Sequence, residues 1–407
     1  MSGAHARRSR REWAWRGRSG RIGLGVVAAV LALGVAGGLV WSVGLAHMGS
    51  ASGKPAAHGQ SSRAHLHASR SQPTPTAMTV AGILPTTADG PISGSDAIVV
   101  ELSEPLSAHS PMPQISMPGT WQQEGTSLMF QPTLGILPST TVSLSVPGGS
   151  NGLEGADGSR LAAPVQASWT VQPGSLLRAY QILATLGYLP VTWTPSSPTP
   201  MTTAEAADAL FSPPDGTFAW RYPNTPPQLQ AMWAPGQDDV LLQGAVMAFE
   251  SDQGMTADGQ VGQAVWAKLL QVTASPSATS AATSQAGYTY TSVSKTLPES
   301  MTVWHDGAVV EQTAVNTGIP GYDTGDGSFP VFERLQTQVM QGTNPDGSHY
   351  ADPVAWVAYF DGSEAVHYIE RGSYGSPQSL GCVEASYSAA EEAWPYLTIG
   401  SLVTVSG

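Results

Sequence analysis

Glycine and proline recur throughout this chain and limit how far a regular helix can extend. The 407 residues include 45 glycines and 32 prolines, while Asp, Glu, Lys and Arg together make up only 12%. Glycine raises the entropic cost of ordering a helix, and proline removes one of its hydrogen bonds. This composition favours short strands joined by turns and linkers over long helices. We therefore predict a multidomain, mainly β protein with about two to four domains.

Charge is divided unevenly along the chain. The first 21 residues contain seven arginines and one glutamate, which leaves ten basic and 29 acidic residues in the rest. Nucleic-acid binding needs clustered Lys and Arg, so nucleic acid is not expected to be a partner of this acidic body.

Residues 22–43 follow the arginines directly and carry no charged side chain. As a helix they would be about 33 Å long, enough to cross a bilayer core of ~30 Å.

The basic and apolar segments together predict a membrane signal anchor. Basic residues stay on the cytoplasmic side, so residues 1–21 would be cytoplasmic and residues 22–43 transmembrane. A cleaved signal peptide is the alternative; its apolar part is usually shorter, ~7–15 residues, although the small side chains at 49–53 could form a cleavage site. Residues 44–76 are rich in Ser, Ala, His, Gln and Pro, and we predict that they form a disordered linker.

Short β-type runs separated by turn residues fill residues 77–172. Leu144 and Val146, for example, alternate with serines, which is the pattern of a strand with one buried face. Several such strands with Gly and Pro turns predict a β-sandwich. With its runs at 118–121 and 128–132, the region resembles the Ig-like modules of bacterial surface proteins, which usually serve as spacers.

Residues 175–272 change to helical spacing. Apolar residues recur every three or four positions up to Gly187, which is expected to end the first helix. The segments 245–249 and 258–269 resemble the peptidoglycan-binding domain of cell-wall hydrolases, which implies glycan as a partner. A Pro-, Thr- and Trp-rich insertion at 191–235 departs from that compact module.

A single cysteine, Cys382, lies in the last domain, expected at 287–407 after a Ser/Ala/Thr linker at 273–286. A lone cysteine cannot form an internal disulfide, and the turn-like sequence around Gly381 favours a reactive thiol over a core residue. Such a thiol needs a base to form the thiolate. His367, 15 residues earlier at the end of an apolar run, can act as that base. Spacing alone does not separate this role from that of a buried core histidine.

The block at 356–405 resembles the YkuD-like L,D-transpeptidase catalytic domain. The signature of that family is a histidine, some fifteen residues, and then Ser/Thr-x-Gly-Cys. Here it reads His367, followed by Ser379-Leu-Gly-Cys382. The resemblance implies a β-rich catalytic domain in which Cys382 is the nucleophile and His367 deprotonates it. It implies no metal and no cofactor.

The resemblance also implies roles for neighbouring residues. The backbone carbonyl of Tyr368 would orient the imidazole, and the N–H groups of Gly381 and Cys382 would form an oxyanion hole. Tyr350 matches a family tyrosine whose hydroxyl faces the reacting carbonyl, with a packed loop aromatic as the alternative. The candidate substrate contacts are Ser379, Trp356 and Glu384.

Two positions depart from the family pattern. Leu380 stands where a polar residue, often histidine, is common, and Glu384 stands where Asn or Arg is usual. A carboxylate near the thiolate would disfavour it, unless a cation offsets the charge. We hypothesise that Arg371 pairs with Glu384.

The function implied by the resemblance is a two-step acyl transfer on peptidoglycan stem peptides. Cys382 would attack the bond after the third residue of a tetrapeptide stem and release D-alanine. The side-chain amine of another stem would then resolve the thioester, giving a 3→3 cross-link. If water resolved it, the protein would be an L,D-carboxypeptidase; a decayed site would leave a non-catalytic cell-wall-binding protein. We predict a membrane-anchored protein of the bacterial cell envelope with its body outside the cytoplasm.

Overall fold

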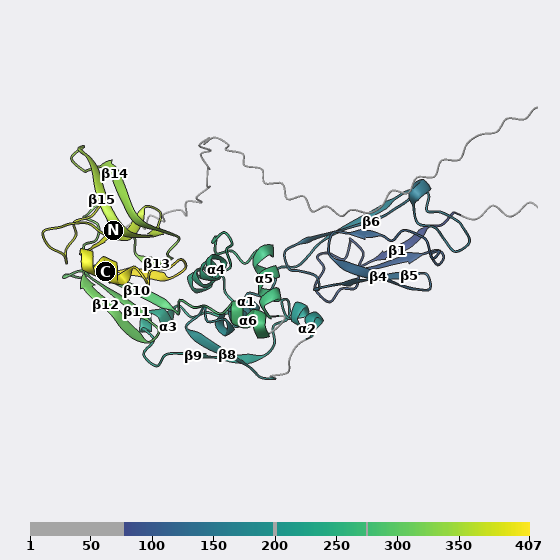
Figure 1. Cartoon of the computed structure of the whole chain (residues 1–407), viewed down its shortest axis with the longest axis horizontal. Helices are drawn as coiled ribbons and strands as arrows, with labels where there is room; N and C mark the ends of the chain where they lie inside the picture. The colour runs from purple at the N-terminus through teal and green to yellow at the C-terminus, as the bar shows by residue number, and fades with distance from the viewer. Residues whose placement is uncertain (1–76, 198–201, 274–275) are drawn as a thin grey trace, which may run out of the picture. The chain divides into compact units, whose positions relative to one another are not determined.

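The computed structural model describes residues 77–197, 202–273 and 276–407, which form a mainly β, multidomain chain as predicted (Figure 1). The segments predicted to be cytoplasmic, transmembrane and linker, up to residue 76, lie outside these ranges. Within the described ranges no helix combines the length and the apolar character needed to cross a bilayer.

Two β-sheets build the first module. The elements are β1 (Val80–Leu84), β2 (Val99–Leu102), β3 (Gln114–Ile115), β4 (Gly119–Glu124), β5 (Ser127–Pro132), β6 (Thr141–Val146), the 3₁₀ turn η1 (Gly149–Asn151) and β7 (Val165–Thr170). One sheet has the order β1-β2-β5-β4 and the other β3-β6-β7. The predicted alternation holds in β6, where Val142, Leu144 and Val146 are buried and the residues between them are not. Leu128 of one sheet and Leu144 of the other share a buried core, so the module is a two-layer sandwich. Its Ig-like classification stays a prediction.

The second module is mostly helical. Its elements are α1 (Leu176–Thr185), β8 (Val191–Pro195), α2 (Thr203–Asp208), β9 (Gly216–Trp220), α3 (Pro227–Ala231), α4 (Val240–Asp252), α5 (Gln263–Thr273) and α6 (Pro276–Ala281). Gly187 follows α1 with a φ of 87°, the left-handed conformation that ends many helices, as predicted. Tyr180, Phe249 and Trp266 of α1, α4 and α5 meet in one buried core. The likeness to a peptidoglycan-binding domain stays a prediction.

The two stretches interpreted as an insertion and as a linker both contain regular structure. The insertion at 191–235 holds α2, α3 and the antiparallel pair β8–β9. The predicted linker at 273–286 contains α6, and Ala282 after it is 2% exposed in the core of the helical module. The linker assignment rested on the Ser/Ala/Thr composition and stays a prediction. Alanine is the strongest helix former and is small enough to pack closely.

Two sheets and one helix make up the C-terminal domain. Its elements are β10 (Thr289–Ser294), β11 (Ser300–His305), β12 (Ala308–Ala314), β13 (Gly327–Pro330), β14 (Glu333–Thr343), β15 (His349–Asp361), β16 (Glu364–Tyr368), β17 (Val383–Ala385), α7 (Tyr387–Ala393) and β18 (Leu402–Ser406). The sheet orders are β12-β11-β10-β18-β13 and β14-β15-β16-β17. Val303, Val366 and Ala390, from the two sheets and α7, belong to one buried core.

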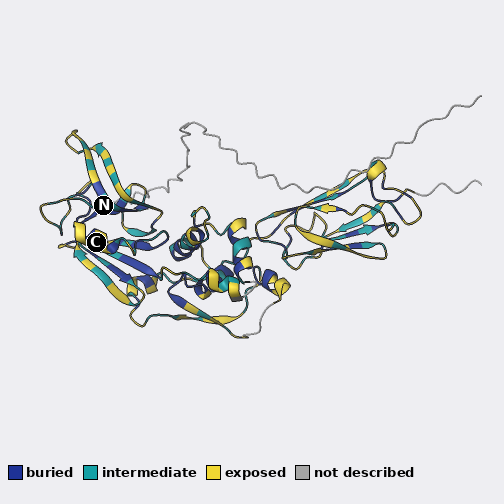
Figure 2. Ribbon diagram, viewed as in Figure 1, coloured by how far each residue is buried: buried dark blue, intermediate teal, exposed yellow. Residues whose placement is uncertain are grey.

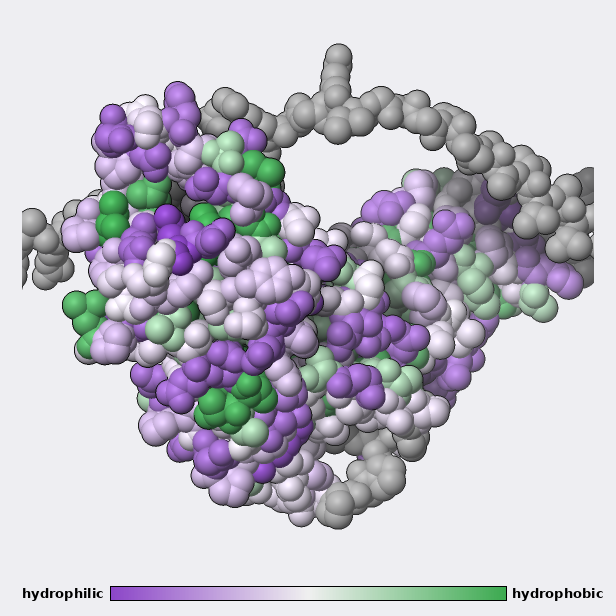
Figure 3. All heavy atoms as spheres, turned by 60° about the vertical axis from the view of Figure 1, so that its left-hand side comes forward, coloured by the Kyte–Doolittle hydropathy of each residue, from purple (hydrophilic) through white to green (hydrophobic). Residues whose placement is uncertain are grey.

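The outer half of the β14–β15 hairpin lies outside that core, whereas Ala358 and Phe360 of β15 belong to it. Its ladder extends from Glu333 opposite Tyr359 to Thr343 opposite His349. No residue of β14 is buried, and Val354 is the first buried residue of β15 (Figure 2). On the face shown in Figure 3, polar residues surround only small apolar patches. The outer half of the hairpin is therefore free to form the wall of a cavity.

Candidate active site

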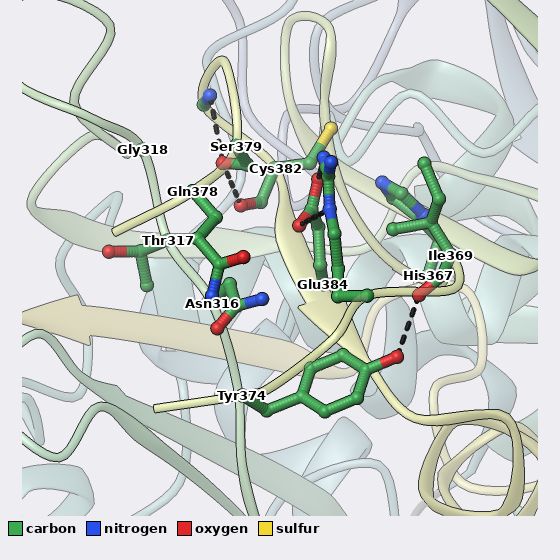
Figure 4. A network of polar contacts seen from close by, with 12 residues as sticks. Asn316, Thr317, Gly318, His367, Ile369, Tyr374, Gln378, Ser379, Cys382 and Glu384 are labelled. Carbon is green, nitrogen blue, oxygen red and sulfur yellow. Dashed lines mark hydrogen bonds and ion pairs between the residues drawn. The ribbon is translucent and has the colours of Figure 1, made fainter. Parts of the chain in front are cut away.

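The parallel pair β16–β17 brings the predicted base and nucleophile to one place. His367 lies directly opposite Glu384, and Val366 lies opposite Val383. Both valines belong to the domain core, so His367 and Glu384 point to the other face. Residues two apart on an extended chain share a face, which places Cys382, just before β17, on the face of Glu384. Figure 4 shows Cys382, His367 and Glu384 gathered at the ends of these strands.

A cavity of about 500 Å³ lies at this face and is lined by both Cys382 and His367. The β14–β15 hairpin forms one wall, to which Tyr350 contributes. Leu380, on the turn before the cysteine, lies at another side. Among the described residues, no group of three or more His, Cys, Asp and Glu side chains is arranged to hold a metal ion.

His367 is held as a neutral base. It is 2% exposed, and its Nδ1 lies 3.1 Å from the carbonyl oxygen of Tyr368, as the sequence predicted. A carbonyl oxygen can only accept, so Nδ1 carries the hydrogen and Nε2 remains free to take a proton. Burial lowers the pKa of His367 from its usual 6.5, while the Tyr368 carbonyl and Glu384 act in the opposite direction. The imidazole is therefore mainly uncharged at neutral pH.

The thiol of Cys382 is protonated at neutral pH. Burial raises its pKa to about 11; the backbone N–H of Ala365 lowers the pKa, and Glu384 and Glu364 raise it. The sulfur lies 3.8 Å from the carbonyl oxygen of Ser363, which accepts its hydrogen. Such a thiol becomes a nucleophile only when a base removes its proton.

Two buried hydroxyls fix the turn that carries the cysteine. Ser379 Oγ donates to the carbonyl of Cys382 (2.6 Å) and accepts from the N–H of Gly381 (3.1 Å). Thr324 Oγ1 donates to the carbonyl of Gly381 (2.8 Å) and accepts from the N–H of Gly318 (2.9 Å). Gly381 has a φ of 120°, a conformation that side-chain-bearing residues rarely adopt. The turn therefore depends on its own serine and on Thr324, which comes from another loop.

These contacts correct two sequence-based roles. Ser379 is 1% exposed, does not line the cavity, and uses its hydroxyl within the turn, where it supports the cysteine. The N–H of Gly381 is already donated to Ser379. It could serve an oxyanion only if that hydrogen bond opened or were shared.

Trp356 lies away from the cavity, contrary to its predicted substrate contact. It has a φ of 57°, and the register of β15 against β16 shifts between Ala355 and Ala358. This bulge changes the side-chain alternation. The indole ring instead lies 5.8 Å from that of Trp394 and 6.2 Å from that of Tyr387. Trp356 therefore packs against α7 and the residue that follows it.

Tyr350 is placed in the cavity by a glycine on the neighbouring strand. It pairs with Gly342, and a Cβ at position 342 would lie 2.5 Å from the Tyr350 hydroxyl oxygen. The ring therefore lies over the glycine, a common arrangement of cross-strand aromatic–glycine pairs. Burial, and secondly the charge of an ionised Cys382, raise the pKa of Tyr350, so its hydroxyl stays a hydrogen-bond donor.

The predicted pairing of Arg371 with Glu384 is confirmed. Arg371 donates from Nε to Oε2 (2.8 Å) and from Nη2 to Oε1 (2.6 Å) of Glu384. The Glu384 side chain is 4% exposed and that of Arg371 is 32% exposed. Both carboxylate oxygens are therefore occupied, and the guanidinium offsets a charge that would otherwise oppose thiolate formation at Cys382.

Two residues of the site were missed from sequence. Thr324 holds the cysteine turn from 58 positions upstream, and no local pattern signals that contact. Asp352 lines the cavity on the same strand as Tyr350. Its spacing of two from Tyr350 on an extended strand could have shown that the two share a face.

We expect Thr324→Val to destabilise the C-terminal domain by about 2 kcal/mol, because it leaves the Gly318 N–H and the Gly381 carbonyl buried without partners. Thr324→Ser keeps the hydroxyl, so the domain should lose much less stability in this variant. Hydrogen exchange of peptides covering residues 318–324 and 379–385 measures the difference. Equal stability of Val and Ser variants would contradict this role of the hydroxyl.

Residues 290–405 match the family model described as YkuD, the L,D-transpeptidase catalytic domain, and the C-terminal domain belongs to that family. Among solved structures, the chain is similar to an Enterococcus faecium L,D-transpeptidase catalytic domain acylated by ertapenem (27% identity over 29% of this chain and 97% of that chain, TM-score 0.27). It is also similar to a mutant Enterococcus faecium L,D-transpeptidase (25% identity over 29% of this chain and 50% of that chain, TM-score 0.27). A third similar structure is a Mycobacterium smegmatis L,D-transpeptidase (13% identity over 82% of this chain and 100% of that chain, TM-score 0.28). The match spans about half the length of the mutant enzyme. A comparison with curated proteins found no match.

Proposed function

We propose that this protein is a peptidoglycan L,D-transpeptidase that forms 3→3 cross-links through a thioester on Cys382. The observation that carries the proposal is the shared cavity of Cys382 and His367 within the domain that matches the family. Nε2 of His367 is free to accept a proton because Nδ1 is engaged by the Tyr368 carbonyl. A thiol and a free imidazole nitrogen lining one cavity are the two groups that nucleophilic catalysis by a cysteine uses.

In the first step His367 takes the proton of the thiol, and the sulfur attacks the carbonyl carbon of the third residue of a tetrapeptide stem. The C–S bond forms, the C–N bond breaks, and the imidazolium returns its proton to the amine of the departing D-alanine. We assign the hydroxyl of Tyr350, on the hairpin wall, as a donor to the developing oxyanion. The cavity must therefore accept an extended peptide between the hairpin and the cysteine turn.

In the second step the side-chain amine of another stem attacks the thioester, His367 takes a proton from that amine, and Cys382 leaves. Attack by water instead would make the protein an L,D-carboxypeptidase through the same intermediate. The two outcomes differ only in the nucleophile that reaches the thioester.

We also propose that residues 22–43 anchor the chain with its body outside the cytoplasm, in the cell envelope. The arginine-rich start and the uncharged 22-residue run that follows support this placement. The modules at 77–172 and 175–272 would then hold the enzyme domain away from the membrane and contact glycan.

A carbapenem tests the enzyme proposal. We expect mass spectrometry to find a covalent adduct on the Cys382 peptide of the wild type and none in Cys382→Ala. A synthetic tetrapeptide stem should release D-alanine with the wild type alone. If neither reagent acylates a folded wild-type protein, the chain is a non-catalytic wall-binding protein instead.

A further inference from the structure

One carboxylate of the cavity wall has no partner. Tyr350, Asp352 and Val354 alternate along β15 and all line the cavity, so they share the face of the hairpin that looks towards Cys382. Asp352 is half-buried, and no hydrogen bond or ion pair joins its carboxylate to another residue of the described ranges. It lies opposite Met340, whose side chain supplies no hydrogen-bond donor.

The charges around Asp352 do not balance. Among the described residues that line the cavity, the acids are Asp352 and Glu384, and Arg371 is the one permanent cation. Arg371 is bound to Glu384 through two nitrogens. His367 is kept neutral by burial. Two carboxylates therefore share one permanent cation: Glu384 holds it by hydrogen bonds, and Asp352 interacts with it only through the longer-range attraction of opposite charges.

Asp352 also lies where two cavities meet. A second cavity, of about 710 Å³, shares Asp352, Ile369 and Arg371 with the first. Beyond Ala355, which pairs with Tyr368, no pairing with β16 is found for the outer residues of β15, so Asp352 lies at an open strand edge. An acyl chain attached to Cys382 can occupy the first cavity while a second substrate approaches through the other. A reaction between two stem peptides needs such a second approach.

We infer that Asp352 binds the protonated side-chain amine of the acceptor stem and presents it to the thioester on Cys382. The inference rests on the proposed function and deepens it, since it names the group that favours an amine over water. A half-buried, unpaired carboxylate attracts a primary ammonium and gives it a charge-assisted hydrogen bond. Neither a water molecule nor an acetylated amine carries the charge that this site would select.

The proton balance of the step is complete with these residues. The bound ammonium first releases one proton to solvent and becomes a neutral amine. Its nitrogen attacks the thioester carbon, so that a C–N bond forms and the C–S bond breaks. The remaining surplus proton on nitrogen passes to Nε2 of His367, and from there to the departing sulfur of Cys382. Asp352 holds the amine and takes no permanent part in the transfer.

The test is a competition between cross-linking and hydrolysis by the full-length protein. The donor is a synthetic tetrapeptide stem with its side-chain amine acetylated, and the acceptor is the same peptide with the amine free. Mass spectrometry gives the ratio of cross-linked dimer to hydrolysed tripeptide at several acceptor concentrations. A variant that only slows acylation lowers both products together and leaves this ratio unchanged.

We expect Asp352→Asn to lower the ratio by about 10- to 100-fold, the effect of losing one charge-assisted hydrogen bond, and to raise the acceptor KM. Asp352→Glu should recover part of the ratio. The control is Glu333→Gln, which removes a carboxylate from an exposed site of the same hairpin that lines neither cavity. It should leave the ratio as in the wild type.

An unchanged ratio in Asp352→Asn would overturn the inference, as would an equal fall in Glu333→Gln, which would indicate a general charge effect. Failure of the proposed function has a different signature. If the wild type releases no D-alanine from either peptide, both proposals fall together. If it hydrolyses the donor without making dimer at any acceptor concentration, the protein is a carboxypeptidase and the acceptor site does not exist.

Discussion

Replacing His367 with glutamine is expected to slow acylation of Cys382 by about 10²- to 10⁴-fold at pH 7, the range for losing a general base. The thiol has a pKa of about 11, so without a base only about 10⁻⁴ of it is ionised at pH 7. The wild type avoids this limit because the neutral imidazole removes the proton during the attack. Glutamine fills a similar volume and can form hydrogen bonds, but it cannot act as a base.

The pH dependence should separate this role from a structural one. Burial lowers the pKa of His367, so wild-type acylation should fall only as the pH drops through a value below 6.5, where the imidazolium can no longer accept a proton. In His367→Gln the rate should instead rise about tenfold per pH unit towards the thiol pKa of about 11, because only preformed thiolate reacts.

The measurement is the second-order rate of carbapenem acylation between pH 5 and pH 10. His349→Gln is the matched control, since His349 begins β15, is exposed and does not line the cavity. It should keep the wild-type rate and profile. A His367→Gln variant with a wild-type profile would show that another group deprotonates the thiol.

The local sequence was enough to predict the elements that carry the chemistry. The apolar run ending at His367 became β16, and the turn glycine beside Cys382 has the backbone conformation that suits it. The charge argument for Arg371 and Glu384 also held, because a carboxylate near a reactive thiol needs a nearby cation. These inferences depended on neighbours within about twenty positions.

Contacts across longer separations could not be predicted from the sequence. A glycine turn suggests free N–H groups, but the buried hydroxyl of Ser379 already accepts the N–H of Gly381. The resemblance placed Trp356 among the substrate contacts, whereas a bulge directs it towards α7. Asp352 was overlooked because a single acid on a strand edge usually faces water. Its importance depends on the cavity, which forms only when the hairpin folds over the cysteine turn.

Arg371→Ala is expected to destabilise the β16–β17 region by about 3 kcal/mol, the lower end of the range for removing one partner of a buried ion pair. The lower end applies because the Arg371 side chain is 32% exposed, so water replaces part of the lost contact. The Glu384 side chain is 4% exposed, and it would keep a buried charge with no cation beside it. That charge also opposes ionisation of Cys382, so acylation should slow as well.

Hydrogen exchange of peptides covering β16 and β17 measures the local loss of stability, which a whole-chain melt of several modules would obscure. In the double variant Arg371→Ala/Glu384→Gln the buried charge is gone, so most of the protection and of the acylation rate should return. Arg371→Lys keeps the cation but not the two parallel hydrogen bonds. Its exchange protection and acylation rate should therefore lie between those of the wild type and those of Arg371→Ala. If the double variant were as unstable as Arg371→Ala, the defect would come from lost packing of the arginine stem, and the charge argument would be wrong.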